Sequence, residues 1–379
     1  AAVFVLELHA RVGVLPAADW THEPTLASCV HANPLIGPDG LVLVADLEGR
    51  LSWVNERWEI EKSWRCYGDG RVHLVESRDW DPVQGRAIVV TVGVSPFLAL
   101  NLVAGHGAQN PAPQEEPSSL FPILKIWLLT LPAPPAAAAA AAAVDAAATA
   151  SPHLTLLRSA PISPTPNRPA PVSALAVSPT LSHIAVGLAD GSVVGWKRVD
   201  ELIEASLYDL EEAAARANDP AQAGGVVVAS TSKLRSVVGG GGGARPFQPG
   251  GMGKLRIFWE GNKEPVTNLG ITTPSPLHAA TATPTLFVLT TSQILALPLA
   301  AKSKTQLSPS VLDDHGAAVG CARLLALGGG KGSAEGELAE RMVVAREEAI
   351  YVYGPDGREG CWAYEGVCLL YSRKSFREV

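Results

Sequence analysis

Four stretches of the chain alternate apolar and polar residues on either side of a short polar turn. The clearest is Ala185–Val199, AVGLADGSVVGWKRV, in which Asp190 and Gly191 stand where the chain must reverse. The same plan recurs in Leu41–Val54, Thr285–Leu299 and Met342–Gly357. An apolar residue at every second position, with glycine or small polar residues between the two runs, predicts a β-hairpin.

The spacing of these hairpins predicts a repeated β architecture. Their turns fall near residues 48, 190, 291 and 347. Once the segments of biased composition are set aside, the gaps approach the roughly 40–45 residues of a four-stranded propeller blade. Helical repeats are the competing architecture, but the apolar period here is two and not 3.6. We therefore predict an all-β fold, with residues 1–379 forming a single β-propeller domain of six to seven WD-repeat-like blades.

Low-complexity segments interrupt the predicted strands. We interpret them as disordered or partly helical insertions in loops, and they span residues 106–119, 131–171 and 200–253. The second contains the alanine run Ala136–Ala143 between proline-rich flanks, and the third begins as an amphipathic helix, with Leu202, Leu207 and Leu210 roughly on one face. Such segments bury too little apolar surface to be held in place. Their composition leaves open that they bind partners.

Composition narrows the class of protein. The chain has 379 residues, 47% hydrophobic and 18% charged, and a net charge of −7. This charge, without a run of five or more basic residues, argues against nucleic acid as a partner.

Five scattered cysteines favour free thiols in a reducing compartment and no metal site. The first residues lack a basic region, and the most apolar window, 132–150, is alanine broken by prolines, so we expect neither a signal peptide nor a membrane span.

The search for catalytic chemistry yields one polar cluster, Asp313-Asp314-His315. Two carboxylates beside an imidazole could bind a metal ion or relay protons. Adjacent residues of one loop rarely converge on a point, however, so we interpret the cluster as a solvated loop. The simplest interpretation of Glu115-Glu116 and Glu347-Glu348 is that they are charged turns, and the simplest interpretation of Gly239–Gly243 is that it is a linker. We assign no catalytic, cofactor-binding or metal-binding residue and expect no enzyme.

The tryptophans divide into two groups. Those in or next to strand-like runs are expected in the core, and they are Trp53, Trp127, Trp196, Trp259 and Trp362. Those in a less regular, charged region are Trp58, Trp64 and Trp80. An exposed aromatic ring beside Arg57 or Arg65 would suit a binding hot spot. We favour packing for this group as well.

Taken in order, the strand-like runs resemble a known family. The segments are LVLVADLEGRLSWV, ILKIWLL, SALAVSPTLSHIAVGLADGSVVGWKRVD, NKEPVTNLGI, LFVLTTSQILAL, DDHGAAVGCARL and VVAREEAIYVYGPDGREGCWAYEG. This ordered set resembles the amino-terminal propellers of the vacuolar protein sorting-associated protein 11 family, over most of residues 40–375. Glu365–Phe376 runs two family segments together, which leaves open whether the last blade is complete.

The resemblance implies a function. Members of that family are core subunits of the HOPS and CORVET tethering complexes, so it implies a non-enzymatic scaffold in vesicle transport and fusion at endosomes and the vacuole or lysosome. It implies other HOPS and CORVET subunits and the fusion machinery as partners, a cytoplasmic location with peripheral membrane association through the complex, and no small-molecule substrate. In the family a solenoid and a RING zinc domain follow the propeller, and the sequence leaves open whether this chain is part of such a longer protein. The alternatives are a WD-repeat-like adaptor of another pathway and a propeller enzyme with Asp313, Asp314, His315 and Glu347 around its channel.

Overall fold

The computed structural model describes the strands, their turns and one helix. The described residues are 27–33, 41–55, 60–68, 70–82, 84–95, 121–131, 152–162, 170–217, 250–261, 263–272, 283–299, 309–328 and 338–363. Residues 106–119, the alanine run and the glycine run therefore lie outside the described residues.

Five four-stranded sheets account for the described strands, and in each the strands follow one another in sequence order as an antiparallel meander. The first sheet comprises β1 (Ala27–Asn33), β2 (Leu41–Asp46), β3 (Arg50–Val54) and β4 (Ile60–Arg65). The second comprises β5 (Arg71–Asp81), β6 (Arg86–Ser95), β7 (Phe121–Thr130) and β8 (His153–Pro161). The third comprises β9 (Val172–Val177), β10 (His183–Leu188), β11 (Val193–Lys197) and β12 (Arg256–Trp259). The fourth comprises β13 (Val266–Thr272), β14 (Thr285–Thr290), β15 (Ile294–Pro298) and β16 (Ser310–Asp313), and the fifth β17 (Ala322–Gly328), β18 (Leu338–Ala345), β19 (Ala349–Gly354) and β20 (Gly357–Ala363).

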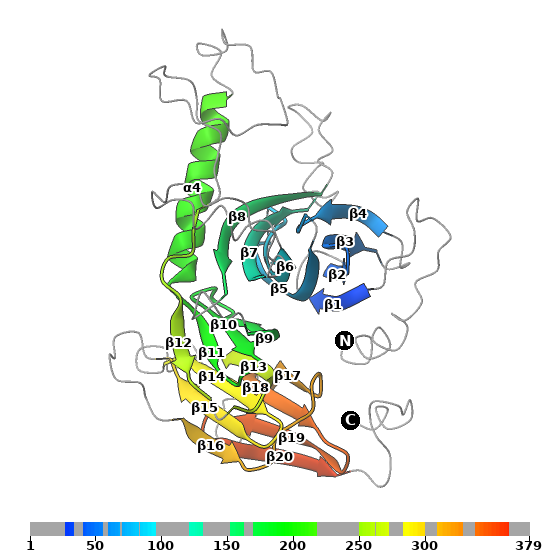
Figure 1. Cartoon of the computed structure of the whole chain (residues 1–379), viewed down its shortest axis with the longest axis vertical. Coiled ribbons are helices and arrows are strands. Elements are labelled where there is room, and N and C mark those ends of the chain that lie inside the picture. The colour runs from blue at the N-terminus through cyan, green and yellow to red at the C-terminus, as the bar shows by residue number, and fades with distance from the viewer. Residues whose placement is uncertain are drawn as a thin grey trace, which may run out of the picture.

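The sheets are arranged as propeller blades. The first strand of each sheet contacts the first strand of the next, from β1 through β5, β9 and β13 to β17, so these five strands are the inner ones. The described sheets follow one another along an open arc (Figure 1). The β-propeller prediction is confirmed, with five blades in the described residues where six to seven were expected. Between the first two predicted turns, near residues 48 and 190, the described residues form one complete sheet, the second.

The four hairpins expected from the sequence are the middle strand pairs of four sheets, β2–β3, β10–β11, β14–β15 and β18–β19. In the first of these, the Asp46 carboxylate accepts hydrogen bonds from the backbone N–H groups of Glu48 and Arg50, at 2.9 and 2.8 Å. In the second, the Asp190 carboxylate accepts from the Ser192 N–H, at 2.9 Å. Gly191 has a φ of 89° and a Cβ there would lie 2.6 Å from the Glu264 carbonyl oxygen, so this turn requires glycine.

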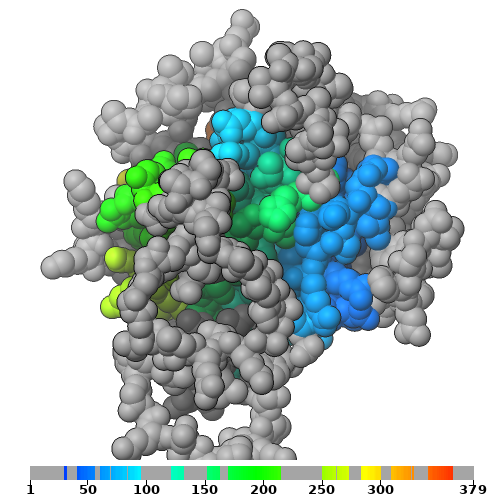
Figure 2. Space-filling model, turned by 90° about the horizontal axis from the view of Figure 1, so that it is seen from above, coloured from blue at the N-terminus to red at the C-terminus, as the bar shows by residue number. Residues whose placement is uncertain are grey.

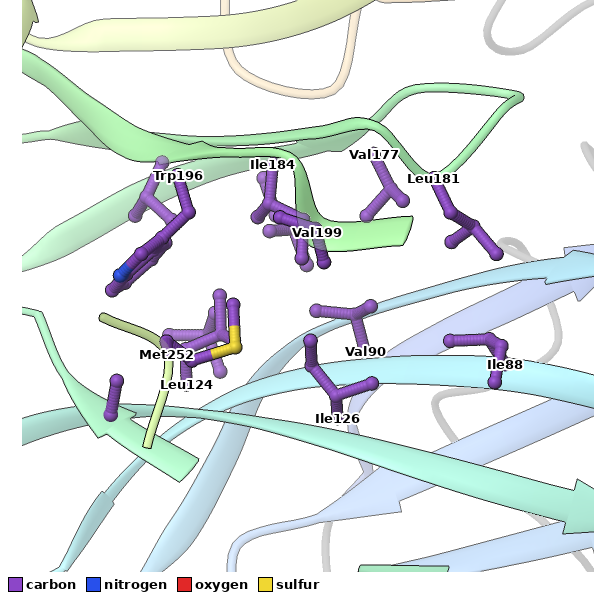
Figure 3. Close-up of a cluster of buried hydrophobic side chains, with 14 of the residues drawn as sticks. Ile88, Val90, Leu124, Ile126, Val177, Leu181, Ile184, Trp196, Val199 and Met252 are labelled. Atoms are coloured by element: carbon purple, nitrogen blue, oxygen red, sulfur yellow. The ribbon is translucent and has the colours of Figure 1, made fainter. Parts of the chain in front are cut away.

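The core consists of apolar layers between neighbouring sheets. Figure 3 shows the layer between the second and third sheets, where Val90 and Ile126 face Val177 and Ile184. Trp196 is 1% exposed in this layer, as expected for a core tryptophan. Further layers lie between the first and second, third and fourth, and fourth and fifth sheets. Among the described sheets, the second, third and fourth therefore bury apolar side chains on both faces, and each layer joins two neighbouring sheets.

One predicted insertion contains a strand. Within residues 131–171, His153–Pro161 forms β8, which pairs with β7 as the fourth strand of the second sheet. The interpretation of the whole segment as an insertion is wrong here, because the side chains of β8 reach apolar layers on both sides. Leu154 packs toward the first sheet, and Leu157 and Ala160 pack toward the third. The proline-rich flanks concealed this short apolar pattern.

The segment 200–253 contains the expected helix and is anchored at both described ends. Helix α4 (Val199–Ala217) packs Ile203 and Leu207 into the layer between the second and third sheets, where Met252 is also buried. Leu202 was expected on the packed face, but Ile203 is the buried residue. Figure 2 shows α4 on one side of the second sheet and the first sheet on the other. The Arg158 side chain of β8 donates to the Leu202 carbonyl at 3.0 Å and to Ser206 Oγ at 2.6 Å, which fixes the base of the helix.

Close packing inside the third sheet leads to a stability prediction. A Cβ at Gly195 on β11 would lie 2.0 Å from the Ile184 carbonyl oxygen and 2.6 Å from the Phe258 ring. Gly195→Ala should therefore destabilise the fold by about 2–3 kcal/mol, because a backbone atom of the neighbouring strand must move. Gly68→Ala is the control, since nothing lies within 4 Å of its Cβ position, and it should change stability by less than about 0.5 kcal/mol. Urea unfolding of both variants tests this, and equal midpoints would contradict it.

Candidate functional site

A buried polar cluster joins the inner strands of the first three sheets. His31 of β1 is 4% exposed, and its Nε2 lies 2.7 Å from Ser77 Oγ of β5 and accepts the Ser77 backbone N–H at 3.1 Å. Its Nδ1 lies 4.0 Å from the Glu76 carboxylate. Arg78 donates to that same carboxylate at 3.1 Å and to the Val177 carbonyl of β9 at 2.6 Å. We call His31, Glu76, Ser77 and Arg78 the axial cluster.

The protonation states in the axial cluster follow from burial. Because Nε2 accepts a backbone N–H, the proton of a neutral His31 ring sits on Nδ1, toward Glu76. Burial lowers the pKa of His31 to about 4, although the Glu76 charge opposes this shift. Burial raises the pKa of Glu76, but His31 and Arg78 outweigh burial and the net pKa lies below its usual value. At neutral pH the cluster therefore combines a neutral imidazole with an ion pair.

Ser77, His31 and Glu76 are the residue types of a hydrolytic triad, in which a histidine lies between a serine and a carboxylate. A nucleophile must be reachable by substrate, and the base must be hydrogen-bonded to its orienting carboxylate. Ser77 is fully buried, at 0% exposed, and the His31 Nδ1 to Glu76 distance of 4.0 Å exceeds a hydrogen bond. The geometry therefore fits a joint between three sheets better than a catalytic centre. Sequence analysis missed this cluster because His31 and Ser77 are 46 residues apart and carry no local motif.

A second buried polar network holds the first sheet against the second. Lys125 of β7 is 6% exposed, and its ammonium donates to the Cys66 carbonyl at 2.5 Å and lies 4.2 Å from the centre of the Tyr67 ring. The Tyr67 hydroxyl donates to the Ile123 carbonyl at 3.0 Å, and Trp127 Nε1 donates to Thr91 Oγ1 at 2.9 Å. Burial lowers the pKa of Lys125 and raises that of Cys66 to about 12, so this thiol is not a reactive thiolate.

The structure brings together the polar cluster singled out in the sequence, at the junction of the fourth and fifth sheets. One carboxylate oxygen of Asp313 accepts hydrogen bonds from the Tyr353 hydroxyl and from Arg346, the latter at 3.3 Å, and the other accepts from the His315 N–H at 3.0 Å. His315 Nδ1 lies 2.8 Å from Asp314. Ligand atoms of Asp313, Asp314 and His315 lie within 4.8 Å of one another. The cluster is thus more convergent than a solvated loop.

The partners of Asp313 decide what this cluster can do. Both of its oxygens accept hydrogen bonds from the protein, and its side chain is 11% exposed, whereas those of Asp314 and His315 are 85% and 75% exposed. Tyr353 is on β19 of the fifth sheet and Arg346 is in the turn between β18 and β19, so Asp313 links the two sheets at the end of β16, the outermost strand of the fourth. Burial raises the pKa of Asp313, but the Tyr353, His315 and Arg346 contacts outweigh it and the net pKa is lowered. These contacts favour a sheet-to-sheet clasp over a metal site.

The remaining residues singled out in the sequence take different places. Glu347 and Glu348 are exposed in the turn between β18 and β19, as expected for a charged turn. Trp64 and Trp80 are half-buried and pack against the apolar layers, as favoured from the sequence. Trp58, Arg57, Glu115 and Glu116 lie outside the described residues.

Comparisons with known proteins give one family. The model of the PEP5/VPS11 N-terminal family matches residues 114–374. A vacuolar protein sorting-associated protein 11 homolog of Dictyostelium discoideum is 31% identical over 114 residues, which cover 30% of this chain and 10% of that relative. Among solved structures, the β-propeller domain of Cps50 (Swd1) of Myceliophteria thermophila is 12% identical with a TM-score of 0.36, covering 76% of this chain and 58% of that one. Raptor of Chaetomium thermophilum is 11% identical with a TM-score of 0.40, covering 91% of this chain and 21% of that one.

The buried histidines predict a pH-dependent stability. Burial lowers the pKa of both His31 and His183 to about 4, below the 6.5 of an unfolded chain. The unfolded chain therefore takes up these protons first as the pH falls, and stability is lost from about pH 6.5 down to about pH 4. From pH 7.5 to 5 each histidine should cost about 2 kcal/mol. Urea unfolding at the two pH values measures this loss, and His31→Gln should remove about half of it; a wild-type stability that is unchanged at pH 5 would refute the assignment.

The clasp predicts unequal roles for two neighbouring carboxylates. Asp313→Asn weakens charge-assisted hydrogen bonds to Tyr353 and Arg346 and should cost about 2 kcal/mol in the free energy of unfolding. Asp314→Asn, the matched control on an exposed side chain, should change it by less than about 0.5 kcal/mol. Thermal and urea unfolding compare them. Equal losses, or a loss for Asp314→Asn that appears only when Zn²⁺ is present, would favour the metal site instead.

Proposed function

The chain belongs to the PEP5/VPS11 N-terminal family, and from this we propose that it is the propeller module of a vacuolar protein-sorting complex that tethers membranes before fusion. The observation that carries the proposal is the family match over residues 114–374, which covers β7 and β8 of the second sheet and the whole of the third, fourth and fifth sheets. The module acts by assembly: a rigid propeller presents loops and sheet edges to other proteins. Binding energy in such a module comes from a few anchor residues and not from one deep pocket.

The internal joints support a scaffold role. The axial cluster, the Lys125 network and the Asp313 clasp each use charged side chains to hold sheets to one another. Groups engaged in this way give the module a fixed shape, and a fixed shape lowers the entropic cost of presenting a binding surface. In this proposal the module is not an enzyme. It has no small-molecule substrate and no nucleic acid partner.

The proposal also covers the protein's binding partners and its location in the cell. We propose that the partners are the other subunits of the HOPS and CORVET complexes and the fusion machinery, and that the protein works on the cytoplasmic side of late endosomes and the vacuole or lysosome. Membrane association is then peripheral, through the complex. Within the described part of the chain, no helix combines the length and apolar character needed to span a bilayer.

Two other functions are possible for a propeller of this kind. A WD-repeat-like adaptor of another pathway has the same fold, and only its partners differ. A propeller enzyme would gather acidic and histidine side chains around the inner strands. Asp313, Asp314 and His315 instead lie at the end of the outermost strand β16, and Glu347 is in an exposed turn, which favours the scaffold.

Co-purification from the protein's own cells tests the proposal. The tagged chain should recover HOPS or CORVET subunits above the level of an unrelated propeller, as quantified by mass spectrometry. The corresponding full-length protein is the positive control. Recovery with the full-length protein alone would mean that the propeller makes no stable contacts itself. If neither recovers tethering subunits, the proposed function is wrong and an adaptor of another pathway is favoured.

A further inference from the structure

The outer edge of the third sheet is a free strand edge in the described structure. β12 pairs with β11 on one side, and it is the last strand in the order of its sheet. Figure 1 shows it at the margin of the arc, below the base of α4. An edge strand presents unpaired backbone N–H and C=O groups, which can pair with an added strand.

This edge is basic although the chain as a whole is acidic. Lys254 and Arg256 are exposed, and neither has an ion pair with a described residue. Arg256 also contributes, after burial, to the lowered pKa of Lys197 on the neighbouring strand. Glu260 is the nearest carboxylate in the sequence and follows Trp259 at the far end of the strand. The chain as a whole has a net charge of −7, so the positive charge at this edge is opposite in sign to that of the whole chain.

An apolar position accompanies the charges. The Ile257 side chain is 50% exposed, in contrast to the next two residues, Phe258 and Trp259, which are buried. Lys254, Leu255, Arg256 and Ile257 line a shallow hollow of about 370 Å³. The edge therefore offers two cations and one apolar contact along four consecutive residues.

The other outer strands lack this combination. β4 carries both Glu61 and Lys62, and on β20 Glu359 forms an ion pair with Arg341. β16 ends in the Asp313 clasp, and β8 already has Gly250 bridged to Arg158. Among the described sheets, β12 thus has the outer edge with exposed cations and no acidic residue on the strand itself.

We propose that the outer edge of β12 binds an extended acidic segment of a partner protein as a fifth strand of the third sheet. Backbone hydrogen bonds hold the added strand, carboxylates of the partner pair with Lys254 and Arg256, and an apolar side chain contacts Ile257. Charge complementarity selects the partner, since a basic segment would be repelled. The inference goes beyond the proposed function and rests on it only in that the module binds proteins.

A peptide-binding assay on the whole chain tests the edge. The probe is a fluorescein-labelled seven-residue peptide that alternates glutamate and valine, followed by anisotropy. The chain should bind it, and a lysine–valine peptide should not bind. The same acidic peptide with a central proline should bind at least about fivefold more weakly, because proline removes a backbone donor and disfavours the added strand.

Charge variants locate the site. The pair Lys254→Glu with Arg256→Glu should weaken binding of the acidic peptide at least about tenfold, and Ile257→Ala by about threefold. The matched control reverses two exposed cations on another outer strand, Lys62→Glu with Arg65→Glu on β4, and should leave the affinity within about twofold. Circular dichroism verifies that each variant is folded.

Each other outcome overturns the proposal. No binding of the acidic peptide would mean that the edge is covered or unsuitable. Equal binding of the proline peptide would mean charge attraction without strand addition, and equal loss in both double variants would mean a general effect of net charge. The assay uses only purified chain and synthetic peptides. A negative result would therefore refute strand addition at β12 without deciding the tethering role, which the co-purification experiment tests separately.

Discussion

The structure depends on the fact that its second, third and fourth sheets bury apolar side chains on both faces. Along β6, Ile88 and Val90 pack toward the third sheet, while Ala87 and Val89 pack toward the first. β10 and β14 are buried along their whole length. A sheet of this kind cannot stand alone in water, because either face would expose a layer of apolar side chains. The adjacent, radially repeated sheets of a propeller are the arrangement that buries both.

Apolar layers alone would leave the sheets free to slide, since hydrophobic contact is not directional. The polar networks supply direction. Arg78 connects β5 to a carbonyl of β9, and Lys125 connects β7 to the segment after β4. Because a buried charge without its partner is costly, each network is satisfied only in one register of the two sheets. The charged residues that would be candidates for chemistry are thereby engaged in holding the blades together.

The sequence predicts those parts of this fold that are encoded locally. β2–β3 and β10–β11 were evident because an aspartate and a glycine close the turn within a few residues. β6 and β7 pair just as fully, but 25 residues separate Ser95 from Phe121, so no hairpin pattern marks them. β8 was missed for a related reason, since only contact with sheets on both sides explains its spacing of apolar residues.

The candidate site shows the same limit more sharply. Asp313, Asp314 and His315 are adjacent in sequence and were noticed, yet their role depends on Tyr353 and Arg346, more than thirty residues away. The axial cluster has no local signal, since its histidine and serine come from different sheets. When internal charges are engaged in this way, specificity for partners must reside in features that the packing does not use. Turns, loops and outer strands meet that condition, and β12 does so with charges that no described carboxylate neutralises. A propeller of this kind separates its tasks: inner strands and sheet faces determine shape, and the outermost strands remain available for recognition.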